Sequence, residues 1–303
     1  MVAHRPVMVT EVLDYLRPRP DGCYLDATVG EGGHAEAILE ASAPTGRVIG
    51  FDRDPNVLAI ARERLAGYGP RCRLLHGDYR EIEGRLPSLG VEALDGILLD
   101  LGISSYQLDQ PERGFSFRAE GPLDMRFDPS GGATAADLVA RCSEEELCRW
   151  LHEYGEERWA RRIARAIVRR REQEPLLTTT QLASVIERAV PPAARYGRIH
   201  PATRTFQALR IAVNRELDGL GEALERLAAR LAPEGRLCVL TYHSLEDRIV
   251  KHRFRALAPA SQNGEGGLLT VLTRRPLRPK PQEIEANPKS RSAKFRAIER
   301  GAC

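Results

Sequence analysis

Long apolar runs and paired cysteines are both missing from this sequence of 303 residues. No stretch approaches the roughly twenty apolar residues of a membrane span, and no signal-peptide core follows residues 1–6. Hydrophobic residues make up 42% of the chain and charged residues 29%, as in ordinary soluble proteins. We therefore expect a cytoplasmic protein without a membrane partner, with one large domain or two smaller ones.

The cysteines are few and scattered, and no two of them form a C-x-x-C pair. A disulfide framework or a zinc site would need a regular spacing of cysteines, so neither is predicted and no metal ligand is assigned. The six cysteines lie at positions 23, 72, 142, 148, 238 and 303.

A glycine-rich stretch, Gly30-Glu31-Gly32-Gly33-His34-Ala35, follows the apolar run 23–29 and precedes the helical run 36–40. Strand, glycine turn and helix together present backbone N–H groups to a nucleotide-like ligand. The pattern Gly30-x-Gly32-x-x-Ala35 satisfies the dinucleotide fingerprint, and Asp52 stands about twenty residues on, where a ribose-binding acid is expected. An NAD-dependent oxidoreductase and a glycine turn without a ligand are therefore both alternatives.

Two carboxylates beside this loop favour a different ligand. Asp26 lies four residues before Gly30, and Glu31 lies inside the turn. Both would repel a pyrophosphate at close range, with little screening in a cleft. S-adenosylmethionine (SAM) has no phosphate and carries an ammonium and a sulfonium group, so it suits the loop better.

Three more acids recur where successive apolar runs end. Asp52, Asp78 and Asp100 end or closely follow the runs 47–51, 73–76 and 94–99. Ligands of open α/β sheets bind outside the carboxyl ends of the strands, so these acids and Asp26 should converge on one crevice. We expect Asp52 to accept the ribose hydroxyls, and Asp78 and Tyr79 to lie at the adenine. Any one of these acids alone would more often be a helix N-cap.

The fifth strand, expected at 236–242, comes more than 130 residues after Asp100. A helix over 206–231, with one apolar face, is expected directly before it. Two further strands, 268–273 and 294–298, would close the sheet as an antiparallel pair. These features predict the α/β fold of a class I SAM-dependent methyltransferase: Rossmann-like, with a mostly parallel seven-stranded sheet. The domain is discontinuous, 1–104 and 204–303, and residues 105–203 form an inserted, mainly helical domain.

The insertion combines helices with an unusual loop. Ser143 with Glu146 is expected to cap one helix, and Thr180 to open another. In the loop 109–132, aromatic residues alternate with arginines, which suits stacking on nucleic-acid bases. The aromatic side chains could equally pin the loop to its own domain. The residues concerned are Phe115, Phe117 and Phe127, with Arg113, Arg118 and Arg126.

Positive charge is concentrated although the net charge is only +3. Between residues 274 and 300 there are nine Lys or Arg against three Glu, and seven Arg fall between 158 and 171. Such clusters are typical of proteins that bind a phosphate backbone. A solvated helix face and a soluble tail are the alternative explanation.

Several long segments together resemble the bacterial small-subunit ribosomal RNA (cytosine-N4) methyltransferases (the MraW-like, methyltransferase H family) over nearly the full length. Tyr242 departs from the family's pattern, where Phe is expected, and so does Phe127, where Met is commoner. The segments are His4-Arg5-Pro6-Val7, Gly30 to His34, Asp52-Arg53-Asp54-Pro55, Asp100 to Ser105, Arg113 to Phe117, Gly121 to Arg126, Tyr154 to Glu157, His200 to Arg210, His243 to Arg248 and Arg291 to Lys294.

The resemblance implies N4-methylation of a cytidine in the decoding centre of 16S rRNA, with SAM as cofactor and the small (30S) subunit as partner; a homodimer stays open. It implies that the insertion recognises RNA. It also implies a cofactor site made by Gly32, Gly33, His34, Asp52, Tyr79, Asp100 and Gln107, to which the residue patterns add Asp26, Gly30 and Asp78.

Two residues are candidates for catalysis. Asp100, with the backbone carbonyls of Leu101 or Gly102, stands where related amino-methyltransferases carry an Asp/Asn-Pro-Pro-aromatic motif. This chain lacks the aromatic residue there, so Asp100 could instead serve mainly the cofactor. His243, after the fifth strand, is either catalytic or a structural hydrogen-bonding residue. A non-catalytic RNA-binding or assembly factor is the alternative from another class.

Overall fold

The computed structural model describes residues 6–197, 199–259 and 268–302, so His4, Arg5 and Cys303 lie outside the described residues. The chain divides into two compact units, each with its own core. The first, here called the sheet unit, is formed by Met1–Gly102 and Gly219–Cys303; the second, the helical unit, is Ile103–Asp218. The insertion predicted from the sequence, 105–203, lies within this helical unit.

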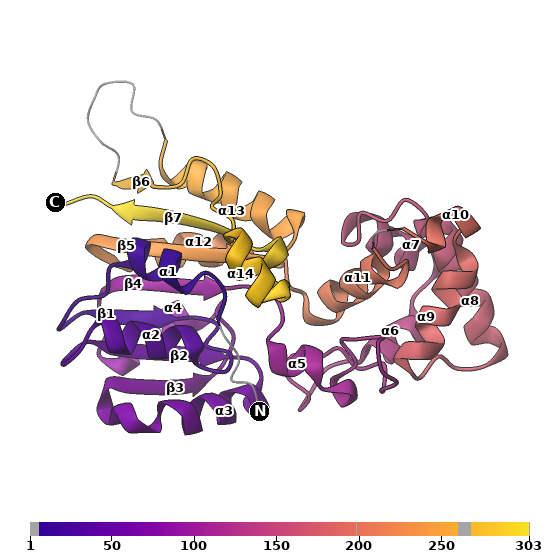
Figure 1. The fold of residues 1–303 in the computed structure, drawn as a ribbon, viewed down its shortest axis with the longest axis horizontal. Coiled ribbons are helices and arrows are strands. Elements are labelled where there is room, and N and C mark those ends of the chain that lie inside the picture. The colour runs from indigo at the N-terminus through magenta and orange to yellow at the C-terminus, as the bar shows by residue number, and fades with distance from the viewer. Residues whose placement is uncertain (1–5, 198, 260–267, 303) are drawn as a thin grey trace. The chain divides into compact units, whose positions relative to one another are not determined.

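The sheet unit is built on one seven-stranded sheet with the order β3-β2-β1-β4-β5-β7-β6 (Figure 1). The first five strands along the chain pair in parallel, β7 runs antiparallel to β5, and β6 runs antiparallel to β7. The predicted mostly parallel sheet with a closing antiparallel pair is therefore confirmed. The strands are β1 (Cys23–Asp26), β2 (Arg47–Asp52), β3 (Cys72–His76), β4 (Leu94–Asp100), β5 (Leu231–Thr241), β6 (Leu269–Val271) and β7 (Lys294–Arg300).

Helices cover both faces of this sheet, because successive side chains of a strand point to opposite faces. In β4, Ile97 and Leu99 pack in one apolar cluster with residues of α4, α12 and α13. Leu98, between them, belongs to a second cluster with α1, α2 and α3. The helices are α1 (Val9–Leu16), α2 (Gly33–Ala41), α3 (Pro55–Leu65), α4 (Ile82–Arg85), α12 (Leu220–Ala229), α13 (Ser244–Leu257) and α14 (Pro281–Ala286), with 3-10 turns at Ala66–Arg71, Pro87–Leu89 and Pro288–Ser292.

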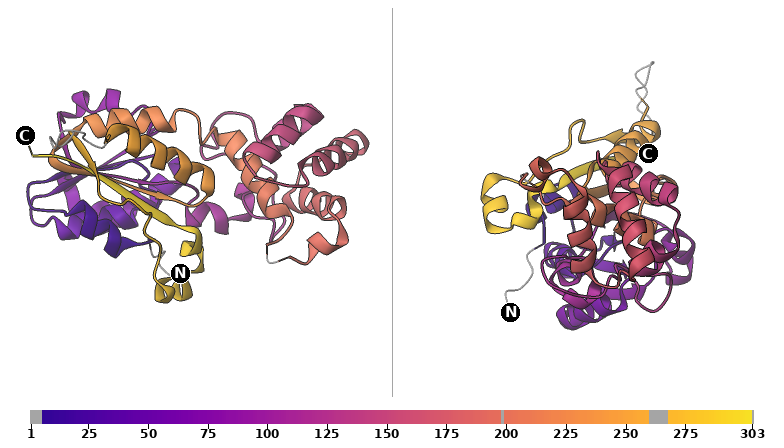
Figure 2. Two further views of the ribbon diagram at one scale, coloured as in Figure 1. Left: turned by 90° about the horizontal axis from the view of Figure 1, so that it is seen from above. Right: turned by 90° about the vertical axis from the view of Figure 1, so that its right-hand side faces the viewer.

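The helical unit packs its helices around a core of its own (Figure 2). Ser143 caps α7 by accepting a hydrogen bond from the N–H of Glu146, at 3.0 Å, which forms one half of the capping box expected for this pair. Thr178 rather than Thr180 begins α9, because its hydroxyl accepts from the N–H of Gln181 and completes a capping box. The helices are α5 (Ser105–Asp109), α6 (Ala135–Arg141), α7 (Glu144–Glu153), α8 (Ala160–Gln173), α9 (Thr179–Ala189), α10 (Pro192–Arg195) and α11 (Ala202–Asn214), with a 3-10 turn at Pro111–Arg113.

The prediction of a single helix over 206–231 is wrong. Two helices, α11 and α12, occupy this stretch, and Leu231 already belongs to β5. Arg215 ends α11 with φ of 51°, and Gly219 precedes α12 with φ of 66°, so the chain turns through left-handed conformations between them. The apolar spacing continues across this turn, and periodicity alone therefore did not reveal the break.

The aromatic side chains of the loop 109–132 face inward. Phe115 stacks on Phe127 with ring centroids 5.8 Å apart. Phe117 stacks on His200 at 4.5 Å and meets Phe206 edge-on at 4.9 Å. These contacts occupy the ring faces that a nucleic-acid base would need, so the structure favours the interpretation that the aromatics pin the loop.

No described helix has the length and apolarity that crossing a membrane requires. The five described cysteines are free.

Asn214 holds the same loop through two hydrogen bonds, and a third fixes its side chain to its own helix, α11. Its amide nitrogen donates to the carbonyls of Met125 (2.7 Å) and Arg210 (3.0 Å), and its carbonyl accepts from the N–H of Phe127 (2.7 Å). Truncation would leave buried backbone groups of the loop without partners, at about 1–3 kcal/mol each.

We therefore expect Asn214→Ala to lower the free energy of unfolding of the helical unit by about 2–4 kcal/mol. Both tryptophans, Trp150 and Trp159, lie in this unit, so urea denaturation followed by tryptophan fluorescence reports on it. The exposed amide of Gln173 offers a matched control, and Gln173→Ala should change stability by less than about 0.5 kcal/mol. Equal stabilities of the two variants would contradict the structural role of Asn214.

Candidate active site

Acidic side chains gather at the carboxyl edge of the parallel strands in the sheet unit. Asp26 ends β1, Asp52 ends β2, and Asp100 ends β4. The three strands are neighbours in register, with Asp26 opposite both Gly50 and Leu98. Asp78 follows β3 by two residues. The structure thus places the four predicted acids at one edge of the sheet.

The glycine turn is held by one of these acids. The N–H of Gly30 donates to one carboxylate oxygen of Asp52 at 2.8 Å, and the N–H of Asp54 donates to the other at 2.9 Å. Gly30 and Gly32 have φ of 54° and 85°, which favours glycine at both positions. The N–H of Gly32 donates to the carbonyl of Val29. Two N–H groups of the turn are therefore used internally and are not available to an anion.

Close packing explains the third glycine of the turn. A Cβ on Gly33, the first residue of α2, would lie 2.9 Å from Cγ of Pro6, closer than real Cβ contacts allow. The lack of a side chain at Gly33 therefore allows Pro6 to pack against the start of α2. A ligand is not needed to account for it.

A buried acid and a buried histidine form the centre of the site. Asp26 is 1% exposed and His34, on α2, is 5% exposed. Burial raises the pKa of Asp26 to about 7, with the charges of Asp100 and Asp52 adding to the shift and His34 opposing it. One carboxylate oxygen of Asp26 and both ring nitrogens of His34 make no hydrogen bond to any described residue. Such unsatisfied buried groups are rare, and they mark a place where a polar ligand would be stabilised.

Asp100 is oriented from two sides. The O–H of Tyr242 donates to its Oδ1 at 2.8 Å, and Nε2 of His34 lies 3.5 Å from its Oδ2. The backbone N–H of Asp100 donates to the hydroxyl of Thr28 at 2.6 Å. Burial, followed by the charge of Asp100, raises the pKa of Tyr242 well above its ordinary value, so the phenol stays a donor. No sequence pattern marks Thr28 or Tyr242 as a partner of Asp100, although Tyr242 is the last residue of the predicted fifth strand and directly follows β5.

Asp52 and Asp78 have opposite electrostatic environments. Burial raises the pKa of Asp52 to about 6, against the two backbone N–H groups that it accepts. Burial alone would also raise the pKa of Asp78, but hydrogen bonds from Arg80 and the charge of Arg53 outweigh it and lower that pKa. Asp78 is therefore held in a clamp of two arginines, for which no motif in the sequence gave a signal.

Three other predicted residues have clear local surroundings. Tyr79 is partly buried against the sheet core, with the guanidinium carbon of Arg80 5.8 Å from its ring centroid. His243 caps α13, because its Nδ1 accepts from the N–H of Glu246 at 3.4 Å. Gln107 lies in the helical unit, where its side chain accepts from the N–H of Ser104 at 3.0 Å in a capping box.

The chemistry of this edge suits a cationic ligand. Burial raises the pKa values of Asp26 and Asp52, and a positive charge near them would favour their ionised forms. An anionic pyrophosphate would meet both the carboxylates and a turn that lacks two of its N–H donors. The structure therefore supports the preference for a cationic cofactor over a dinucleotide.

Comparisons with known proteins agree on one family. The model of the MraW methylase family matches residues 1–301. The chain is 53% identical to the ribosomal RNA small subunit methyltransferase H of Pelobacter propionicus, over 98% of each chain. It is 52% identical to the protein of the same name from Geobacter sulfurreducens, over 98% of this chain and 99% of that one. A solved structure of a putative rRNA-methylase from Clostridium thermocellum aligns over 98% of this chain and 99% of that chain, at 11% identity and a TM-score of 0.46.

The raised pKa of Asp26 predicts how stability depends on pH without a ligand. The folded protein holds the proton up to about pH 7, whereas the unfolded chain releases it near the ordinary value of 3.8. The contribution of Asp26 is therefore fully present below pH 4 and is lost as the pH rises towards 7. The charged groups facing it are His34 on α2, Asp52 on β2 and Asp100 on β4.

Between pH 5 and pH 8, the free energy of unfolding of Asp26→Asn should fall less than that of the natural protein, by roughly 2–4 kcal/mol. Urea denaturation at both pH values measures this difference. The exposed Asp14 provides the control, since Asp14→Asn should keep the natural slope. Parallel pH profiles for the natural protein and Asp26→Asn would show that Asp26 is not protonated in the folded state.

Proposed function

Because the chain belongs to the MraW methylase family, we propose that it methylates N4 of one cytidine in the decoding centre, near the P site, of 16S rRNA. SAM supplies the methyl group from its sulfonium and leaves as S-adenosylhomocysteine. The enzyme acts in the cytoplasm on the small (30S) ribosomal subunit. Curated relatives at 53% and 52% identity, named ribosomal RNA small subunit methyltransferase H, support this assignment.

The observation that carries the proposal is the cluster of the buried Asp26 and His34 with the partly exposed Asp100. Its unsatisfied polar atoms and its excess of carboxylates fit the ammonium and sulfonium groups of SAM. The cluster lies at the carboxyl edge of a mostly parallel sheet, where ligands of such sheets bind. The residues present therefore fit the cofactor that the family uses.

Each side of the cofactor has a proposed partner. Asp52 keeps free lone pairs beyond the two N–H groups that it accepts, and these would take the ribose hydroxyls. Tyr79 would pack on the adenine, and the clamped Asp78 would fix the backbone beside it. Gly30, Gly32 and Gly33 shape the turn, and Gln107 is proposed from the family resemblance alone.

Asp100 is the residue best placed to assist the chemistry. The N4 amine of cytosine is a poor nucleophile because its lone pair is delocalised into the ring. A hydrogen-bond acceptor for an amine hydrogen would return electron density to the nitrogen and receive its positive charge as the bond to carbon forms. The Oδ2 of Asp100, with the carbonyls of Leu101 and Gly102 beside it, would provide that acceptor while Tyr242 holds Oδ1.

The helical unit would bind the RNA. Arginines of α8 lie on its exposed side and have the spacing of one helix face, which suits contacts to phosphates. The base within structured rRNA would have to be unstacked to reach Asp100. These exposed arginines are at 161, 162, 165 and 169 of α8, and Arg158 lies just before the helix.

The deciding experiment transfers tritiated methyl from SAM to 30S particles that lack the modification, with the product nucleoside identified by mass spectrometry. N4-methylcytidine at a single position is expected. Asp100→Ala should lower kcat by about 10²–10⁴-fold, the usual contribution of a positioned acid–base group. Asp14→Asn, on the exposed face of α1, should retain full activity.

Three results would contradict the proposal. Absence of methyl on cytosine N4 would exclude this reaction. Binding of NADH instead of SAM in calorimetry would favour the oxidoreductase. An unchanged function of Asp100→Ala in ribosome assembly, without methyl transfer, would favour a non-catalytic factor.

His243 is proposed to act structurally, as the cap of α13. Because asparagine is also a good N-cap, His243→Asn should keep kcat within about threefold, while His243→Ala should lose about 1 kcal/mol of stability. Methyl-transfer assays and urea denaturation of both variants measure these effects. A loss of more than a hundredfold in kcat for both variants, with the fold retained, would instead make His243 catalytic.

A further inference from the structure

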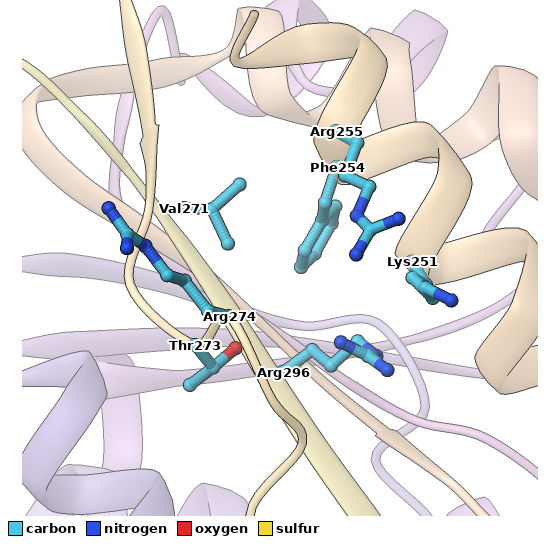
Figure 3. Close-up of a pocket in the computed structure, with 7 residues that line it drawn as sticks. All are labelled: Lys251, Phe254, Arg255, Val271, Thr273, Arg274 and Arg296. Atoms are coloured by element: carbon cyan, nitrogen blue, oxygen red, sulfur yellow. The ribbon is translucent and has the colours of Figure 1, made fainter. Parts of the chain in front are cut away.

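A cavity of about 280 Å³ lies between α13 and the β6–β7 edge of the sheet unit (Figure 3). None of the acids of the candidate active site lines it. Side chains from α13 face side chains from β7 and from the segment that begins with β6. The lining residues are Lys251, Phe254, Arg255, Val271, Thr273, Arg274 and Arg296.

Four of these seven residues are cationic, and none is acidic. Arg296 is 5% exposed and is fixed by a hydrogen bond from its Nε to Asp247, at 2.7 Å. Lys294 donates to the same carboxylate at 3.1 Å. Burial would raise the pKa of Asp247, but these two hydrogen bonds outweigh it and lower that pKa, so Asp247 stays ionised. Its single charge is already shared by two cations, and the cavity keeps a surplus of positive charge.

Three of the four cationic side chains have no partner among the described residues. Within the described part of the chain, Lys251, Arg255 and Arg274 form no ion pair and no side-chain hydrogen bond. Other basic groups nearby are paired; Arg253, also on α13, contacts Glu225 and Glu222. Clustered cations without counterions are costly to hold together, and an anion would relieve their repulsion.

The sheet register relates this cavity to the candidate active site. Asp100 pairs with Leu240, and Leu240 pairs with Phe295, so one row of residues crosses β4, β5 and β7. Two strand spacings, about 10 Å, separate Asp100 from β7. Arg296 follows that row and points to the face covered by α13, whereas Asp100 lies against His34 on the face covered by α2, so the cavity and the acids are on opposite faces of the sheet. An extended polyanion bound at Asp100 would have to pass the sheet edge for one of its further phosphates to reach the cavity.

We propose that this cavity binds a single backbone phosphate of the RNA substrate. The inference rests on the proposed function. Arginine pairs with phosphate oxygens in a bidentate way, and lysine adds a point charge. Phe254 and Val271 give the cavity an apolar wall that suits a ribose. The volume lies at the lower limit of small-molecule pockets, which fits a phosphate with its sugar better than a whole cofactor.

The test neutralises the three uncommitted cations and leaves Arg296 in place. The variant is Lys251→Gln/Arg255→Gln/Arg274→Gln in the full chain. Its matched control, Arg17→Gln/Arg62→Gln/Arg73→Gln, removes three exposed charges elsewhere on the sheet unit. Methyl transfer to unmodified 30S particles gives KM and kcat, filter binding to naked 16S rRNA gives the salt dependence, and calorimetry gives the affinity for SAM.

The pocket variant should raise KM for 30S particles at least about tenfold, with kcat and SAM affinity within twofold of the natural protein. Because only one phosphate is involved, the slope of log K against log salt should fall by about one. The control should match the natural protein throughout. Val271→Phe, which fills the cavity and keeps every charge, should raise KM in the same way with a smaller change of slope.

Other outcomes overturn the inference. Equal KM and slope for the pocket variant and the control would exclude a phosphate site. A slope reduced by about two or more would indicate diffuse attraction rather than one phosphate. Weaker binding of 30S particles with unchanged binding of naked rRNA would indicate an acidic protein partner. If the natural protein transfers no methyl, the proposed function fails, while filter binding still tests the cavity.

Discussion

The gathering of three carboxylates at one edge of the sheet is the constraint on which the rest of the site depends. Parallel strands end at the same edge, so β1, β2 and β4 bring Asp26, Asp52 and Asp100 together whatever their individual roles. Burial makes the ionised forms of Asp26 and Asp52 costly, and it raises their pKa values to about 7 and about 6. The N–H of Gly30 donates to Asp52 and the O–H of Tyr242 donates to Asp100, but one oxygen of Asp26 and both ring nitrogens of His34 have no hydrogen-bond partner among the described residues. A cationic cofactor completes this arrangement electrostatically, and a pyrophosphate would worsen it.

The same constraint explains the behaviour of the glycine turn. Its formal pattern suits dinucleotide binding, in which backbone N–H groups meet a phosphate. Here Asp52 takes the N–H of Gly30, and Val29 takes that of Gly32. The turn is therefore a support for the acids, and its geometry is set by the close approach of Pro6 to Gly33. Fold and cofactor preference follow from one set of interactions.

Much of the fold could be predicted because strand periodicity and strand-end acids are local signals. The strands and the antiparallel closure appear where apolar runs predicted them. The break between α11 and α12 could not be predicted, because Arg215 adopts a left-handed conformation that is uncommon for arginine. Contacts between segments distant in the sequence could not be predicted either. The ion pair of Arg53 with Asp78 and the hydrogen bond from Tyr242 to Asp100 depend on three-dimensional proximity. The alternating Phe and Arg pattern allowed two interpretations, and the ring contacts of Phe115 and Phe117 favour the packing one.

Charge of opposite sign is separated within a single sheet, and the separation has a physical reason. Where acid and base lie in contact they neutralise each other, as Asp78 does with Arg80 and Asp247 with Arg296. Asp26, Asp52 and Asp100 lie at the ends of parallel strands, and Lys251, Arg255 and Arg274 lie beside the antiparallel pair, with the apolar Leu240 and Val239 of β5 between the two groups. At about 10 Å and an effective dielectric constant of 20, two unit charges attract by only about 1.5–2 kcal/mol, against about 4 at contact distance. The acidic cluster and the basic cavity therefore do not neutralise each other. The first suits a cation, and the second suits a phosphate. An enzyme that must hold a positive cofactor and a polyanionic substrate at neighbouring points needs this spacing, and β5 supplies it.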